Sequence, residues 1–144
     1  MDRRQFITTA AAGLALPALV RPALAEAPSL RFRDLYSRGM ELALETAALD
    51  GQAVRIAGYM APPLKPEVGF FVLTKLPMAT CPFCNDAADW PTDLVVAYAA
   101  DPIDVVRFST LIMVEGRFET GFKTDEETGF VSYLRLMDVS YRKL

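Results

Sequence analysis

The most informative absence in this sequence is histidine, which occurs at none of its 144 positions. Without histidine the chain has no Ser-His-Asp triad, no Cys-His pair and no H-E-x-x-H zinc site. Proton transfer near neutral pH would have to come from a carboxylate, lysine, cysteine or tyrosine with a shifted pKa. The composition therefore disfavours most hydrolase mechanisms and favours a binding role over an enzymatic one.

The chain also lacks an apolar run long enough to stay in a membrane. Its best candidate, residues 10–20, is rich in alanine and interrupted by a proline, whereas a membrane-spanning helix needs about 20 apolar residues. This run follows Arg3 and Arg4 and precedes Ala-Leu-Ala at 23–25, an order typical of a cleaved twin-arginine export signal. We expect cleavage after Ala25 and a periplasmic protein without stable membrane insertion. A helix that remains with the domain and an uncleaved anchor are the alternatives.

Cleavage would leave 119 residues, a length that fits one domain with its own core. The whole chain has 15 basic and 18 acidic side chains, and the signal takes away three arginines and one aspartate. The mature protein would therefore carry a net charge of −5. Nucleic acid and anionic lipid need a basic surface, so neither is an expected partner.

Hydrophobic periodicity predicts one helix followed by strands. In residues 36–49, Met40 and Leu44 recur at helical spacing, and Gly51 would follow the end of this helix. Beyond it, alternating or continuous apolar runs indicate five strands; these runs are 52–60, 69–76, 93–99, 110–119 and 129–141. The link at 121–128 is predicted to be a hairpin connection with a charged tip.

Five strands in about 90 residues, preceded by one short α-helix, favour a mainly β fold in the form of a five-stranded OB-like barrel. The predicted organisation is a signal peptide at 1–25, a leader and helix at 26–50, and an OB-like β-barrel domain at 51–144. Gly58 suggests a bulge or sharp bend in the first strand. A small open sandwich is the main alternative. A thioredoxin fold is disfavoured, because Trp90-Pro91 would interrupt the helix expected after a C-x-x-C motif.

Three stretches of the chain resemble an uncharacterised bacterial family of exported OB-like proteins. Residues 49–64, L-D-G-Q-A-V-R-I-A-G-Y-M-A-P-P-L, are similar to the family's opening strand. Residues 112–116, I-M-V-E-G, and 131–139, V-S-Y-L-R-L-M-D-V, are similar to two of its later strands. The resemblance implies a periplasmic, twin-arginine-exported protein associated with metal-responsive transporters of the ABC type. The family loop often has a cysteine before a proline-rich run, sometimes with histidine, whereas this chain has Cys-Pro-Phe-Cys.

The segment with distinctive chemistry is A-T-C-P-F-C-N-D at 79–86, where Cys81 and Cys84 are the two cysteines of the chain. Cysteines at this spacing can form a disulfide, bind a metal ion as thiolates, or cycle between dithiol and disulfide. The oxidising periplasm favours the disulfide. So short a loop would stabilise the fold by only about 2 kcal/mol through chain entropy, and all three uses stay open.

A metal ion would need ligands besides the two thiolates. Asp86 and Asp89 are the nearest carboxylates in the sequence, and Met78 and Met60 could add a thioether. Two thiolates with carboxylates suit zinc, whereas two thiolates with a thioether suit copper in its reduced state. The structural alternatives are core filling for the methionines and turn capping for the aspartates.

Redox cycling is the enzymatic alternative, with Cys81 as the attacking thiol and Cys84 as the resolving thiol of a thiol-disulfide oxidoreductase. Such thiols usually lie at a helix N-terminus or beside a cation. The charges closest in the sequence are mostly carboxylates, those of Asp86, Asp89 and Asp93. Negative neighbours raise a thiol pKa, so the local charge argues against this use.

Two further groups of residues are expected to be structural. The aromatic side chains of Phe70, Phe71, Phe83 and Trp90 could line a ligand surface, but such residues more often close a core. The acidic residues 125–127 are expected to form a solvated hairpin tip.

These inferences combine into one hypothesis about function. The chain is predicted to be a periplasmic, non-enzymatic binding or accessory protein linked to metal homeostasis or transport. Its centre would be the Cys81–Cys84 loop, which holds a zinc or copper ion or a disulfide that shapes a binding surface. A membrane transporter or another periplasmic protein is the expected partner.

Overall fold

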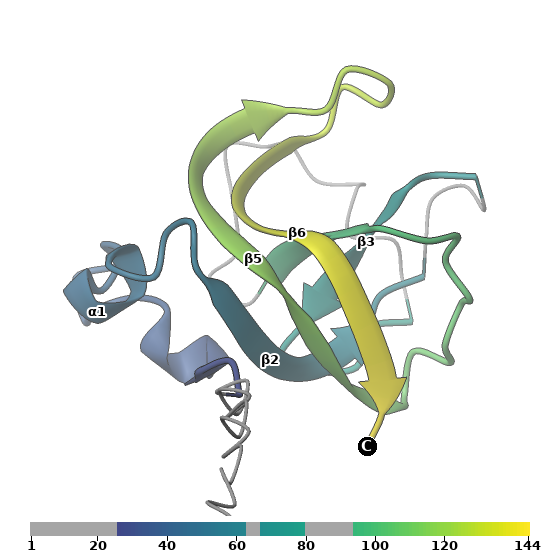
Figure 1. The fold of residues 1–144 in the computed structure, drawn as a ribbon, viewed down its shortest axis with the longest axis horizontal. Coiled ribbons are helices and arrows are strands. Elements are labelled where there is room, and N and C mark those ends of the chain that lie inside the picture. Colours follow the sequence, from purple (N-terminus) through teal and green to yellow (C-terminus); the bar gives the residue numbers. More distant parts are fainter. Residues whose placement is uncertain (1–25, 63–66, 80–93) are drawn as a thin grey trace, which may run out of the picture.

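A computed structural model describes residues 26–62, 67–79 and 94–144, which form a mainly β structure (Figure 1). Its elements are β1 (Ser29–Leu30), the 3-10 helix η1 (Phe32–Asp34), α1 (Leu44–Ala47), β2 (Ala53–Met60), β3 (Phe70–Thr74), β4 (Leu94–Ala99), β5 (Leu111–Thr124) and β6 (Val131–Lys143). The five predicted strands are confirmed as β2 to β6, and β1 is an addition to them. Within the described ranges, no helix is long and apolar enough to cross a membrane.

The strands form one mixed sheet in the order β1-β2-β3-β4-β6-β5, and β2 also pairs with β5. The β1–β2 and β4–β6 pairs are parallel and the other pairs are antiparallel. Each strand from β2 to β6 therefore has at least two partner strands.

Apolar side chains form clusters on both faces of β3. Phe71 and Leu73 belong to the larger cluster, which includes residues of every strand from β1 to β6. Phe70 and Val72 belong to a second cluster with Ala61, Leu94 and Val96. Burial on both faces explains why β3 has a continuous apolar run and not an alternating one. Phe70 and Phe71 are thus core residues, whereas Phe83 and Trp90 lie outside the described residues.

The predicted helix over 36–49 is wrong in extent, because α1 covers only Leu44–Ala47. A tight turn precedes it, in which Met40 has φ +63° and its N–H donates to the Ser37 carbonyl at 3.1 Å. A left-handed residue cannot continue a right-handed helix. Met40 is 66% exposed and Leu44 is 88% exposed, so the residues at helical spacing do not face the core.

Of the bulge or sharp bend expected at Gly58, the bulge is not observed. Gly58 pairs with Ile112 of β5 in regular register. A Cβ atom at this position would lie 2.7 Å from the Thr74 carbonyl oxygen and 2.9 Å from the Phe32 ring. The position needs glycine because β3 and η1 approach the backbone of β2 this closely.

The register shifts of the sheet lie at other positions, one between Ala97 and Ala99 of β4 in its pairing with β6 and two along β5. Its pairing with β6 is irregular between Glu115 and Arg117 and again between Thr120 and Lys123. Bulges bend a strand, and β5 curves strongly in Figure 1, where the β5–β6 hairpin projects at the top. The Asp50 carboxylate accepts the Thr120 N–H at 2.8 Å, which ties the N-terminal segment to β5 beside the second bulge.

Candidate functional site

The metal-ligand candidates Cys81, Cys84, Asp86 and Asp89 lie outside the described residues. The strands on either side of them are described, and Thr74 at the end of β3 pairs with the first residue of β4. Among residues 26–62, 67–79 and 94–144, no group of three or more Cys, Asp or Glu side chains could hold a metal ion.

The two methionine candidates lie in different surroundings. Met60 is fully buried in the larger cluster, and its Sδ accepts the Val106 N–H at 3.4 Å. Met78 is partly buried against the second cluster, which lies on the other face of β3. The structure therefore does not bring the two sulfur atoms together, and Met60 serves as a core residue that anchors the segment before β5.

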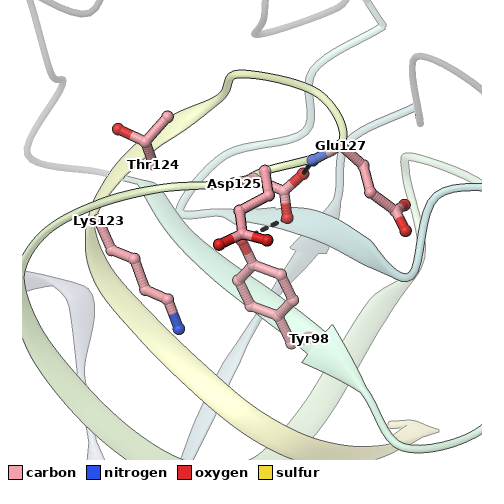
Figure 2. Close-up of a pocket in the computed structure, with 6 residues that line it drawn as sticks. Tyr98, Lys123, Thr124, Asp125 and Glu127 are labelled. Atoms are coloured by element: carbon pink, nitrogen blue, oxygen red, sulfur yellow. Dashed lines mark hydrogen bonds between the residues drawn. The ribbon is translucent and has the colours of Figure 1, made fainter.

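A pocket of about 320 Å³ lies between the end of β4 and the β5–β6 hairpin (Figure 2). Its walls carry one ammonium group, one phenol and three carboxylates; the lining residues are Tyr98, Lys123, Thr124, Asp125, Glu126 and Glu127. Figure 2 shows Tyr98 on β4 directed toward Asp125 of the hairpin. The sequence predicted the charged hairpin tip, but not that β4 contributes to a hollow beside it.

Asp125 organises the hairpin turn through its carboxylate. Its Oδ1 accepts the N–H of Glu127 at 3.2 Å, and the N–H and hydroxyl of Thr128 at 2.9 Å each. Its own N–H donates to the Phe130 carbonyl at 2.7 Å, and Gly129 has φ +71°. Such an Asx turn fixes the loop without help from a ligand.

Tyr98 connects this turn to the sheet. Its hydroxyl donates to Asp125 Oδ2 at 3.2 Å. Burial, and then the Asp125 charge, raise the pKa of Tyr98 to about 12. Partial burial opposes ionisation of Asp125, but the hydrogen bonds from Thr128 and Tyr98 outweigh it and lower the pKa of Asp125. Near neutral pH the phenol therefore stays protonated and the carboxylate stays ionised.

A buried arginine supports the base of the hairpin. Arg135 is 4% exposed, and its Nη1 donates to the Gly121 carbonyl at 2.7 Å and to the carbonyl and hydroxyl of Ser132 at 3.1 Å each. Its Nε lies 3.5 Å from Glu119 Oε2, an ion pair without hydrogen-bond geometry. Glu119 Oε1 also lies 3.7 Å from Nη2 of Arg117. Arg135 thereby fixes the carbonyl of the second β5 bulge.

Sequence reasoning missed Tyr98 and Arg135 as members of this region. Arg135 stands in the apolar run Leu134-Arg135-Leu136, where strand alternation predicts an outward, solvated side chain. The isolated charge within an apolar strand was the available signal. Its burial depends on the Gly121 carbonyl from a neighbouring strand, which pattern alone does not reveal.

Comparison with known proteins identifies a shared fold. No family model matches the sequence, and no curated protein sequence matches it. The crystal structure of a DUF3299 family protein from Pseudomonas aeruginosa is similar, with a TM-score of 0.54 over 82% of this chain and 97% of that chain. The two sequences are 17% identical over this match, so the likeness concerns the fold.

Proposed function

We propose that this chain is a periplasmic accessory protein that binds one zinc or copper ion through its Cys81–Cys84 loop and serves metal homeostasis or transport. The loop would be carried by an OB-like barrel, and the protein would act by binding, without catalysing a reaction. Cys81 and Cys84 would supply thiolates, with Asp86 and Asp89 as further ligands.

The pairing of the strands supports the barrel. Because β2 pairs with both β3 and β5, the series β2-β3-β4-β6-β5 returns to the strand from which it started. The β4–β6 pair is parallel, as expected where the middle strand of a five-stranded Greek-key barrel meets its last strand. The residues of η1 and β1, among them Leu30 and Phe32, join the larger cluster and would close one end.

One observation carries the proposal for the cysteine loop. Thr74 and Leu94 are paired neighbours, so the connection that contains both thiols leaves and re-enters the sheet at one point. The Thr74 hydroxyl donates to the Tyr59 carbonyl at 3.2 Å or the Leu76 carbonyl at 2.7 Å, and Met78 packs against the second cluster. A long connection that is held at both ends and contains several thiol and carboxylate side chains is a common setting for a binding site.

The position of the first described residues is compatible with export and processing. Cleavage after Ala25 would keep the Pro28 carbonyl, which accepts the Arg55 N–H at 3.0 Å, and would keep Leu30 and Phe32 in the core. It would also keep the ion pair of Glu26 with Arg55 at 3.1 Å. Removal of the proposed signal would thus cost none of these contacts.

Native mass spectrometry of the protein purified from periplasm tests the proposal. One bound zinc or copper ion, lost in both Cys81→Ser and Cys84→Ser, is the expected result. An Asp86→Asn, Asp89→Asn variant should hold the metal ion more weakly. A metal-free protein whose mass is lower by two hydrogens would show a disulfide and overturn the metal proposal. The same spectrum should place the mature N-terminus at Glu26.

A further inference from the structure

We infer that the β5–β6 hairpin is a docking surface for a partner protein that presents an apolar pocket bordered by basic side chains. The hairpin surface consists of Phe122, Tyr133, Glu126 and Glu127. This inference rests on described residues other than those of the cysteine loop and does not depend on the metal proposal.

The first argument is the exposure of a large aromatic side chain. Phe122 is 74% exposed. Its ring centroid lies 4.9 Å from that of Tyr133, with the planes tilted by 49°. A backing ring of this kind holds an exposed ring in a limited range of orientations, and aromatic side chains with few rotatable bonds are frequent anchors of protein interfaces.

The second argument is that the fold holds the Phe122 backbone rigidly. Phe122 lies in the second β5 bulge, directly after Gly121, which has φ +100°. The buried Arg135 donates to the Gly121 carbonyl at 2.7 Å. Bulges commonly redirect a side chain, and a preorganised anchor loses less conformational entropy on binding.

The third argument is charge, which indicates the kind of partner. Asp125, Glu126 and Glu127 follow Phe122 along the hairpin, with Lys123 as the single basic residue between them. Glu127, the farthest of them, follows Phe122 by five residues, which span at most about 17 Å of extended chain, so these carboxylates lie within one interface footprint of the Phe122 backbone. A second copy of this acidic chain would bring like charges together, whereas basic side chains around an apolar pocket complement them.

A defined peptide probe tests the inference. An acetylated peptide of alternating lysine and leucine is titrated into the isotope-labelled mature protein and followed by amide NMR, with a glutamate-leucine peptide as the charge control. We expect saturable shifts centred on residues 121–128 and Tyr133 with the lysine peptide alone. Binding should weaken at about 0.5 M salt, where charges are strongly screened.

Two variants and a control make the test specific. Phe122→Ser and the double variant Glu126→Lys, Glu127→Lys should each weaken peptide binding about tenfold or more. Val105→Ser alters an apolar residue that is 59% exposed outside the hairpin and should leave binding unchanged. Circular dichroism confirms that each variant folds.

Three outcomes would overturn the inference. Shifts spread evenly over the surface would indicate non-specific attraction, and equal losses for Phe122→Ser and Val105→Ser would remove Phe122 as the anchor. A dimer in sedimentation analysis that Phe122→Ser abolishes would assign this surface to a second copy of the chain.

Discussion

Replacing Arg135 with methionine is expected to lower the free energy of unfolding by about 2–3 kcal/mol. Methionine occupies a similar volume but donates no hydrogen bond, so the Gly121 and Ser132 carbonyls lose a charged donor at 2.7 and 3.1 Å. Each unsatisfied carbonyl costs about 1–3 kcal/mol where it is buried. Relief of the desolvated guanidinium offsets part of this cost. Glu119 keeps its contact with Arg117 at 3.7 Å, which prevents a larger loss.

Urea denaturation followed by circular dichroism measures this loss. With a slope of about 1–3 kcal/mol per M, the midpoint should fall by roughly 1 M and the slope should not change. Arg117→Met is the matched control, because this side chain is 47% exposed and surface ion pairs contribute at most about 1 kcal/mol. Arg135→Lys retains the charge but lacks the planar guanidinium, so its urea midpoint should lie between those of wild type and Arg135→Met. A loss for Arg135→Met no greater than that for Arg117→Met would refute the reasoning.

Three further predictions concern Gly58, Tyr98 and Asp125. Gly58→Ala should destabilise the fold by about 1–3 kcal/mol in thermal denaturation, because its Cβ would meet the Thr74 carbonyl oxygen at 2.7 Å. Gly69→Ala is the control, because a Cβ atom at this position would have no other atom within 4 Å, and this variant should be as stable as wild type or slightly more stable. Equal losses of stability in Gly58→Ala and Gly69→Ala would contradict this account. The pKa of Tyr98 is raised from 10.0 to about 12, so the stability that this phenol supplies is present below pH 10 and declines as pH rises to 12. Phenolate absorbance is titrated in wild type and in Tyr98→Phe to check this prediction. Wild type should show a phenol that ionises near pH 12 and is missing in Tyr98→Phe, and two identical titration curves would contradict the prediction. The pKa of Asp125 is lowered from 3.8 because hydrogen bonds from Thr128 outweigh partial burial, so its stabilisation is lost as pH falls through that lowered pKa. Asp125→Asn should flatten the acid side of the stability profile, and an unchanged profile would show that the turn does not depend on this charge.

The sheet was predictable because its signal is local. Apolar alternation in 52–60 places Val54 and Ile56 on one face, and both are buried in β2. The continuous run at 69–76 indicates burial on two faces, which β3 has through two separate clusters. Strand period is a property of neighbouring residues, so these elements could be identified without knowing their partners.

The N-terminal segment was less predictable because its structure depends on distant contacts. Helical spacing of Met40 and Leu44 suggested an apolar face, yet the core receives Leu30, Phe32 and Leu35 from the preceding residues. The Thr46 hydroxyl donates to the Asp34 carbonyl at 2.8 Å, which holds the segment folded back on itself. Tertiary packing of this kind routinely overrides helix propensity.

The sequence by itself determined that the chain is mainly β, where β2 to β6 lie, and that the β5–β6 hairpin has a charged tip, because strand period and turn chemistry are local properties. It also led to the prediction that the thiols of Cys81 and Cys84 bind a metal ion, and this stays a prediction. Only the tertiary structure decided that Arg135 is buried and that Tyr98 contacts Asp125. It also decided that β3 and η1 approach Gly58 too closely for any side chain there. Each of these depends on atoms from segments far apart in the chain, and the register that brings them together is set by packing of the whole sheet.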